Sequence, residues 1–275
     1  MAQAAPDLYA VFGNPIAHSK SPRIHAIFAQ QCGHTLRYEK RLAPLDGFAA
    51  SVQAFIAEGG RGANVTVPFK LEAHALADEL APAARVDGKI LGDNTDGAGL
   101  VTDIVERAGQ AIAGRRVLVL GAGGATRGVL LPLLQQGPQQ LLVANRTAST
   151  AQQMVAQFQH DFAASIGHTA FAACGLDHIA GQFDLIINAT SASLQAQVPT
   201  LPENVFATDA MAYDMVYGKD LTPFLAYAQQ RGARVRDGLG MLVEQAARAF
   251  FIWRQIQPET HAVYAALRSE LQSGQ

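Results

Sequence analysis

The sequence predicts an α/β protein with mostly parallel sheets, and three observations support this fold class. Short apolar runs that end at glycine, proline or asparagine alternate with segments of helical periodicity along most of the 275 residues. Residues 117–120 are apolar at every position, as in strands that are buried on both faces. A glycine-rich turn follows this run directly, and leucines at helical spacing come after the turn.

Composition limits the class of protein. The chain is 49% hydrophobic and 16% charged, which is sufficient for one large or two medium domains. The net charge of −2 and the lack of a basic run argue against nucleic acid or a membrane surface as partner. Cys32 and Cys174 stand in neither metal nor redox spacing, and the first residues lack the pattern of a signal peptide. We therefore expect a soluble, cytoplasmic protein without a metal.

The first part of the chain alternates strands and helices. Strands are expected at residues 8–12, 36–42, 63–67 and 89–91, and helices at 47–57 and 70–80. Another helix should begin near Ser21, with Ser21 as N-cap and Pro22 at the first helical position. This alternation predicts a largely parallel sheet.

The second part repeats the same alternation in a doubly wound pattern. A helix around residues 100–105 leads to strands at 117–120, 140–144, 170–172, 184–188, 210–215 and 234–236. Helices are expected after the glycine-rich turn and at residues 148–158, 239–256 and 259–271.

The turn at residues 121–126 is the first candidate ligand site. Its glycines allow a tight turn and a close approach of the backbone to a ligand, and it opens a helix. A strand, a glycine-rich turn and a helix N-terminus together suit a pyrophosphate. Thr126 stands where the G-x-G-x-x-G pattern has its third glycine, so a βα turn without a ligand is the alternative.

Lys70 and Asp96 each follow an expected parallel strand, at the end where open α/β sheets place ligands. A carboxylate can orient a lysine, and burial lowers the pKa of the lysine, so that the two form a proton-transfer pair. A solvated lysine and an N-cap aspartate are the alternatives. Hydroxyls and an amide at the same edge suit a small polyhydroxylated acid; they belong to Ser19, Ser21, Asn64 and Thr66.

The end of the second strand of the doubly wound part indicates which dinucleotide binds. NAD-binding folds carry an acidic residue at this point, whereas residues 141–144 lead into Asn145, Arg146 and Thr147. Arg146 offers a guanidinium to a 2′-phosphate, which favours NADP. A merely solvated strand-end arginine is the alternative.

Five blocks of this sequence resemble motifs of the shikimate dehydrogenase family and stand in the family's order over nearly the whole chain. They are residues 13–22 (GNPIAHSKSP), 64–70 (NVTVPFK), 92–97 (GDNTDG), the Gly121 loop and 237–242 (DGLGML). The blocks that contain Lys70 and Asp96 are highly specific, whereas the loop is shared with many enzymes.

The resemblance implies a reversible hydride transfer between NADPH and the C3 carbonyl of 3-dehydroshikimate, which yields shikimate on the pathway to chorismate and aromatic amino acids. Lys70 would transfer the proton at the oxygen, with Asp96 as its partner and as a substrate ligand. Further substrate ligands would be Ser19, Ser21, Asn64, Thr66, Tyr217 and Gln245. Cofactor contacts would come from Gly121, Ala122, Gly123, Gly124, Ala125, Thr126, Asn145, Arg146, Thr147, Thr190, Met215 and Gly238.

The same resemblance implies two domains. Residues 1–97 and 239–275 would form the substrate domain, a mostly parallel α/β structure to which the C-terminal helix returns, and residues 98–238 would form a Rossmann-type, doubly wound NADP-binding domain. The expected partner is a small-molecule substrate, and the expected state is a monomer or a homodimer.

Two features depart from the family pattern. Thr150 stands where a second arginine is often found, which softens the preference for NADP. The family's Gly-Ala-Val-Asn-Thr segment, whose asparagine contacts substrate, is missing before Gly88, where the chain has only residues 81–88. The alternatives are therefore a catalytically impaired NADP-binding homologue, an NAD-using quinate/shikimate dehydrogenase, or another Rossmann enzyme with an unrelated first domain.

Overall fold

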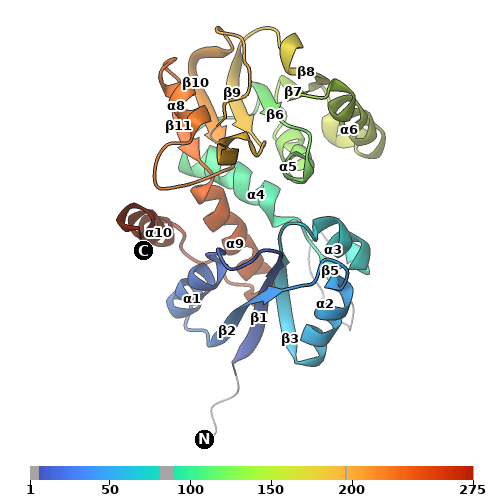
Figure 1. The fold of residues 1–275 in the computed structure, drawn as a ribbon, viewed down its shortest axis with the longest axis vertical. Coiled ribbons are helices and arrows are strands. Elements are labelled where there is room, and N and C mark those ends of the chain that lie inside the picture. The colour runs from blue at the N-terminus through green and yellow to red at the C-terminus, as the bar shows by residue number, and fades with distance from the viewer. Residues whose placement is uncertain (1–5, 81–89, 196, 275) are drawn as a thin grey trace, which may run out of the picture. The chain divides into compact units, whose positions relative to one another are not determined.

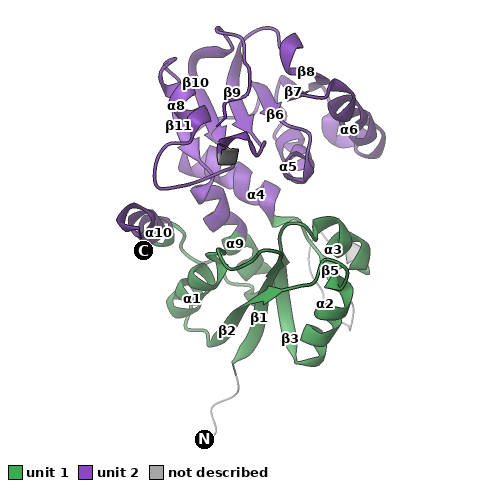
Figure 2. Ribbon diagram, viewed as in Figure 1, with its two compact units in different colours: residues 1–95, 246–263 green, residues 96–245, 264–275 purple. Residues whose placement is uncertain are grey.

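The computed structural model describes residues 6–80, 90–195 and 197–274, which form two compact units (Figures 1 and 2). Unit 1 comprises residues 1–95 and 246–263, and unit 2 comprises residues 96–245 and 264–275. Unit 1 is discontinuous along the chain, because its second segment follows most of unit 2.

Unit 1 contains a three-stranded parallel sheet in the order β2-β1-β3. Its strands are β1 (Asp7–Gly13), β2 (Leu36–Leu42) and β3 (Gly60–Val65), and its helices include α1 (Ser21–Gln31), α2 (Phe48–Ala57) and α3 (Lys70–Leu76). The short strands β4 (Glu79–Leu80) and β5 (Leu91–Gly92) form a separate parallel pair.

Each face of the unit 1 sheet has its own apolar layer, because side chains alternate along a strand. Leu8, Ala10 and Phe12 of β1 pack with Phe48 and Phe55 of α2. On the opposite face, Tyr9 stacks on Trp253 of helix α9 (Leu239–Arg254), with ring centroids 4.8 Å apart. The end of α9 therefore helps to form the core of unit 1.

Unit 2 contains a six-stranded parallel sheet in the order β11-β10-β9-β6-β7-β8. The strands are β6 (Arg116–Leu120), β7 (Gln140–Asn145), β8 (Ala170–Gly175), β9 (Phe183–Asn188), β10 (Phe206–Asp214) and β11 (Arg234–Asp237). The chain starts at β6, adds β7 and β8 on one side, and then crosses to add β9, β10 and β11 on the other. This is the doubly wound order, and its switch point lies between β6 and β9.

Helices cover both faces of this sheet (Figure 1). Val117 and Val119 pack into a cluster with α5 (Gly124–Gln135) and α6 (Ala148–Asp161), whereas Leu118 and Leu120 pack with α8 (Pro223–Gln229). Unit 2 also contains most of α4 (Thr95–Thr102), which continues into a π-helical turn (Asp103–Arg107), the short α7 (Ala163–Ile166), the first part of α9 and most of α10 (His261–Ser273). Two 3-10 turns cover Leu176–His178 and Ala192–Gln195.

The expected elements are found, with local corrections. Ser21 is not the N-cap of α1; it is the first helical residue, and Ser19 Oγ accepts a hydrogen bond from its backbone N–H at 3.3 Å. Strand β3 covers Gly60–Val65 rather than residues 63–67, and α3 ends at Leu76 rather than residue 80. Lys89, in the expected strand 89–91, lies outside the described residues.

The compact units differ from the expected domains at their boundaries. The first boundary lies at 95/96, and the later one falls inside α9 at 245/246 (Figure 2). Residues 264–275 group with unit 2, where Arg268 of α10 bonds to Asp237. None of the described helices has the length and hydropathy needed to span a membrane.

Candidate active site

The glycine-rich turn connects β6 to α5 at the switch point of the unit 2 sheet. Gly121 has a φ of +101°, and a Cβ there would lie 2.9 Å from Thr190 Cγ2, so both conformation and space require glycine. Gly123 and Gly124 have open space where a Cβ would stand. The N-cap Gly123 has no side-chain cap, which leaves the first N–H groups of α5 for a ligand.

The structure shows why a threonine can stand at position 126, where the G-x-G-x-x-G pattern has its third glycine. Its side chain is fully buried, and its hydroxyl donates to the carbonyl of Gly121 at 2.8 Å. The threonine thereby braces the turn from inside. Its cofactor contact stays a prediction, and the buried side chain leaves the backbone of Thr126 as the group that would make it.

A buried polar network supports the loops after β9 and β10, which carry Thr190 and Met215. Asn188 Oδ1 accepts hydrogen bonds from the backbone N–H of Thr190 at 3.1 Å and from its hydroxyl at 2.7 Å. The Asn188 amide donates to Ser193 Oγ, which in turn donates to Asp214 at 2.6 Å. Asn188 and Asp214 are fully buried, and sequence reasoning missed both, although each ends a strand at the ligand edge of the sheet.

Gly238 brings the end of β11 against Met215. A Cβ at Gly238 would lie 2.2 Å from the Met215 carbonyl oxygen, and the Gly238 N–H donates to Val216 at 3.2 Å. The structure therefore places Thr190, Met215 and Gly238, together with the glycine-rich turn, at the carboxyl ends of the strands of one sheet.

The segment after β7 lies at this same edge. Asn145 donates a side-chain hydrogen bond to the carbonyl of Thr147 at 3.0 Å, which orders the turn. Arg146 and Thr147 are exposed, and within the described parts of the chain Arg146 forms no ion pair. The Arg146 guanidinium therefore keeps its positive charge uncompensated by any carboxylate in the described part of the chain, and the end of β7 carries no acidic residue. Both features suit the binding of a 2′-phosphate.

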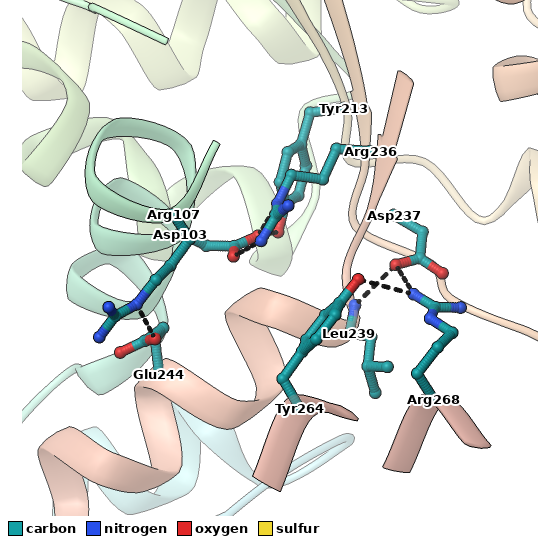
Figure 3. Close-up of polar contacts among 9 residues, drawn as sticks. All are labelled: Asp103, Arg107, Tyr213, Arg236, Asp237, Leu239, Glu244, Tyr264 and Arg268. Carbon is teal, nitrogen blue, oxygen red and sulfur yellow. Dashed lines mark hydrogen bonds and ion pairs between the residues drawn. The ribbon is translucent and has the colours of Figure 1, made fainter. Parts of the chain in front are cut away.

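Tyr217, which follows β10, is half-buried. Burial and, secondarily, the negative charge of Asp237 raise its pKa. Arg268 donates to the carbonyl of Gly218 at 3.1 Å and to Asp237 at 2.5 Å, and Asp237 also accepts from the N–H of Leu239 at the start of α9 (Figure 3). The residues next to Tyr217 are thus tied to α9 and α10.

Asp96 and Gln245 lie on helices that pack closely in unit 2. A Cβ at Gly99 of α4 would lie 2.6 Å from the backbone nitrogen of Gln245, and a Cβ at Gly97 would lie 2.4 Å from Pro132 Cγ of α5. These two glycines let α4 approach both neighbours and fix the first turn of α4. Asp96 is the second residue of that helix, is half-buried, and is therefore not its N-cap.

The remaining candidates gather at the carboxyl edge of the unit 1 sheet. The Thr66 N–H donates to the carbonyl of Phe12 at 2.9 Å, and a Cβ at Gly13 would lie 2.6 Å from Thr66 Cγ2. The loops after β1 and β3 therefore adjoin. These loops carry Ser19 and Thr66. Asn64 lies near the end of β3, Ser21 is the first residue of α1, and the half-buried Lys70 is the first residue of α3.

Lys70 lies in unit 1 and Asp96 in unit 2, so their pairing stays a prediction. The segment 81–88, where the family's asparagine is missing, lies outside the described residues. Among the residues that are described, no group of three or more His, Cys, Asp or Glu side chains could hold a metal ion.

Three family models match successive parts of the chain. The shikimate dehydrogenase substrate-binding domain matches residues 11–90, the shikimate/quinate 5-dehydrogenase family matches residues 103–205, and the shikimate 5′-dehydrogenase C-terminal domain matches residues 238–268.

Similar proteins agree over nearly full length. A protein of Nitrosospira multiformis called shikimate dehydrogenase (NADP(+)) is 56% identical, over 97% of this chain and 99% of its own. An Ael1 enzyme of Pseudomonas putida matches in structure with a TM-score of 0.86 and 44% identity, over 95% of this chain and 98% of its own. A shikimate 5-dehydrogenase of Thermus thermophilus, solved with NADP(H) and shikimate, has a TM-score of 0.82 and 31% identity, over 96% of this chain and 100% of its own.

Proposed function

This chain belongs to the shikimate dehydrogenase family and is an NADP-dependent oxidoreductase, and from that premise we propose which of its residues perform the reaction. The reaction is the reversible reduction of 3-dehydroshikimate to shikimate. The observation that carries the proposal is the division of the candidate residues between two sheet edges. One edge has the features of a dinucleotide site, and the other has hydroxyls, an amide and a lysine.

At the dinucleotide edge, the chain binds and orients NADP. The N–H groups at the start of α5 bind the pyrophosphate in the open space over Gly123 and Gly124. Arg146 binds the 2′-phosphate, with Asn145 and Thr147 shaping the turn. Gly121, Ala122, Ala125, Thr190, Met215, Gly238 and the backbone of Thr126 line the rest of the site. NADPH, when bound, supplies the hydride.

At the other edge, Lys70 donates a proton to the C3 oxygen as the carbonyl is reduced, and it accepts that proton back when shikimate is oxidised. Asp96, on α4 of unit 2, has the role that the family resemblance implies, as the partner of Lys70 in proton transfer and as a substrate ligand. The carboxylate and the ring hydroxyls are held by Ser19, Ser21, Asn64 and Thr66 of unit 1 and by Tyr217 and Gln245 of unit 2. In this scheme residues 1–97 and 239–275 act as the substrate domain and residues 98–238 as the NADP domain.

Lys70→Ala tests the assignment in a spectrophotometric assay of NADPH oxidation with 3-dehydroshikimate. We expect kcat to fall by about 10²–10⁴-fold, the range typical of positioned proton transfer, while NADPH binding, measured by fluorescence titration, stays unchanged. Lys219→Ala is the matched control, because it removes an exposed lysine of unit 2 that has no assigned role.

Each other outcome has a definite meaning. Activity that survives in Lys70→Ala would remove Lys70 from the mechanism. NADPH binding without any turnover in the wild type would instead identify the impaired homologue that the short segment 81–88 suggests. Higher turnover with NADH than with NADPH would identify the NAD-using enzyme. The curated relatives, called NADP-dependent shikimate dehydrogenases at 50–56% identity, favour neither alternative.

We further propose that the protein works in the cytoplasm as a monomer or homodimer, with a small-molecule substrate as its partner. The near-neutral net charge of −2 supports the expectation that neither nucleic acid nor a membrane surface is a partner.

A further inference from the structure

Tyr38 lies on the face of the unit 1 sheet that Asn64 shares. In the strand register, Tyr38 of β2 pairs with Tyr9, and Asn64 of β3 pairs with Val11, on opposite sides of the central strand β1. Because residues two apart on a strand point to the same face, Tyr38 and Asn64 point to the same side of the sheet. A side chain as long as tyrosine is needed to reach across β1, since neighbouring strands lie about 4.8 Å apart.

The Tyr38 hydroxyl donates a hydrogen bond to Asn64 Oδ1 at 2.7 Å. An amide group is planar, so this bond also determines where Nδ2 points: away from Tyr38, with two N–H donors. Within the described part of the chain, no hydrogen bond from Nδ2 is recorded. Burial raises the pKa of Tyr38, against a smaller lowering by a hydrogen bond with Ser21, so the hydroxyl keeps its proton and remains a donor.

An aromatic enclosure holds the Tyr38 ring. The imidazole of His25 on α1 stacks on it with centroids 4.4 Å apart and planes 8° apart, and the Trp253 ring lies 6.3 Å away. Gly62 of β3 leaves room for the Trp253 ring, because a Cβ at Gly62 would lie 2.5 Å from the indole nitrogen. His25 is fully buried.

We propose that Tyr38 is a positioning residue for shikimate binding: its hydroxyl fixes the Asn64 amide with its N–H donors directed to the substrate. The inference rests on the proposed role of Asn64 as a substrate ligand. Without the hydroxyl, the amide can turn over and present an oxygen where the substrate needs a donor. The aromatic enclosure keeps the phenol ring in one orientation, so that the hydrogen bond is preorganised before the substrate arrives.

Tyr38→Phe keeps the ring and its stacking and removes only the hydroxyl. We expect the KM for shikimate to rise about tenfold, the equivalent of one hydrogen bond, while the KM for NADP and the melting temperature change little. Tyr9→Phe is the matched control: Tyr9 lies on the same face and its hydroxyl accepts a hydrogen bond from Arg254 at 3.2 Å, but it makes no recorded contact with Asn64. Its KM for shikimate should equal that of the wild type.

Asn64→Ala and the double variant separate this inference from the proposed function. If Tyr38 acts through Asn64, Asn64→Ala raises the KM at least as much, and adding Tyr38→Phe to it has no further effect. Additive effects of the two substitutions on the KM would overturn the positioning role of Tyr38 but not the role of Asn64. So would an unchanged KM in Tyr38→Phe together with a raised KM in Asn64→Ala. An unchanged KM in Asn64→Ala would overturn both the role of Asn64 and the inference built on it.

Discussion

At the scale of single residues, we expect Arg146 to decide between two cofactors that differ by one phosphate. We expect Arg146→Ala to raise the KM for NADPH by about 10–100-fold, since hydrogen bonds to charged groups contribute about 1.5–3 kcal/mol each, and to leave the KM for NADH nearly unchanged. The measurement is the ratio of kcat/KM for NADPH to that for NADH. The control is Arg115→Ala. Arg115 is exposed and lies just before the first residue of β6, at the end of the strand away from the glycine-rich turn, so this variant should keep the wild-type ratio. A ratio that does not change in Arg146→Ala would exclude Arg146 from phosphate binding.

His25 makes unit 1 sensitive to acid. Burial, against a smaller raising by a side-chain hydrogen bond with Asn64, lowers its pKa from 6.5 to about 3. Below pH 6.5 the unfolded chain binds a proton that the folded protein excludes, so stability falls as the pH drops from 6.5 towards 3. At pH 5 this one group should cost about 2 kcal/mol relative to pH 7.5.

His25→Phe keeps an aromatic ring in the enclosure and removes the titration. Its free energy of unfolding should therefore fall less than that of the wild type between pH 7.5 and 5, measured in urea at each pH. Trp253 is the only tryptophan of the chain and lies 5.2 Å from His25, so its fluorescence reports the unfolding of this unit. His178→Phe, which replaces an exposed histidine of unit 2, is the control. Equal pH dependence of the wild type and His25→Phe would contradict the prediction.

At the scale of elements, a buried carboxylate joins four segments of unit 2. Asp103, in the π-helical turn after α4, accepts hydrogen bonds at 2.8 Å from Tyr213 of β10 and from Arg236 of β11 (Figure 3). Gly240 of α9 packs against this carboxylate, where a Cβ would lie 1.9 Å from Asp103 Oδ1. Burial and, next, the charge of Asp103 raise the pKa of Tyr213 far above its usual value, so the phenol stays a donor.

Asp103→Ala should therefore destabilise unit 2 by about 3 kcal/mol, because it leaves the Arg236 guanidinium largely buried without its counter-charge. The measurement is a thermal melt followed by circular dichroism. Asp177→Ala removes an exposed aspartate that pairs with His178, and should melt like the wild type. A melting temperature of Asp103→Ala that matches this control would show that the pair contributes nothing to the stability of the unit.

Sequence patterns predicted the elements well because each strand and helix has a local signature. Residues 36–42 were predicted as a strand and form β2 with these bounds. The apolar run 117–120 was predicted as a strand buried on both faces, and all four of its residues are fully buried in β6. The supporting residues were missed because their roles depend on partners far along the chain. In the sequence, Tyr38 looks like an ordinary strand residue. Its hydrogen bond with Asn64 depends on the strand order β2-β1-β3, which brings the two residues to either side of β1. Asp103 could have been noticed in the sequence. It is an acidic residue next to Ile104 and three residues after Leu100, on the apolar face of the expected helix.

At the scale of the whole molecule, neither sheet alone identifies the reaction. The doubly wound sheet of unit 2 fits many dinucleotide enzymes, since a fold hosts many functions and only a site specifies one. What distinguishes this chain is carried by short segments outside that sheet: the loops after β1 and β3 with Lys70 in unit 1, and the first turn of α4 with Asp96 in unit 2. Glycines hold these segments, Gly13 against Thr66 and Gly97 against Pro132. A side chain at Gly97 would press on Pro132, and one at Gly13, the last residue of β1, would press on Thr66. We therefore expect a substitution at either glycine to displace a segment that carries candidate catalytic residues.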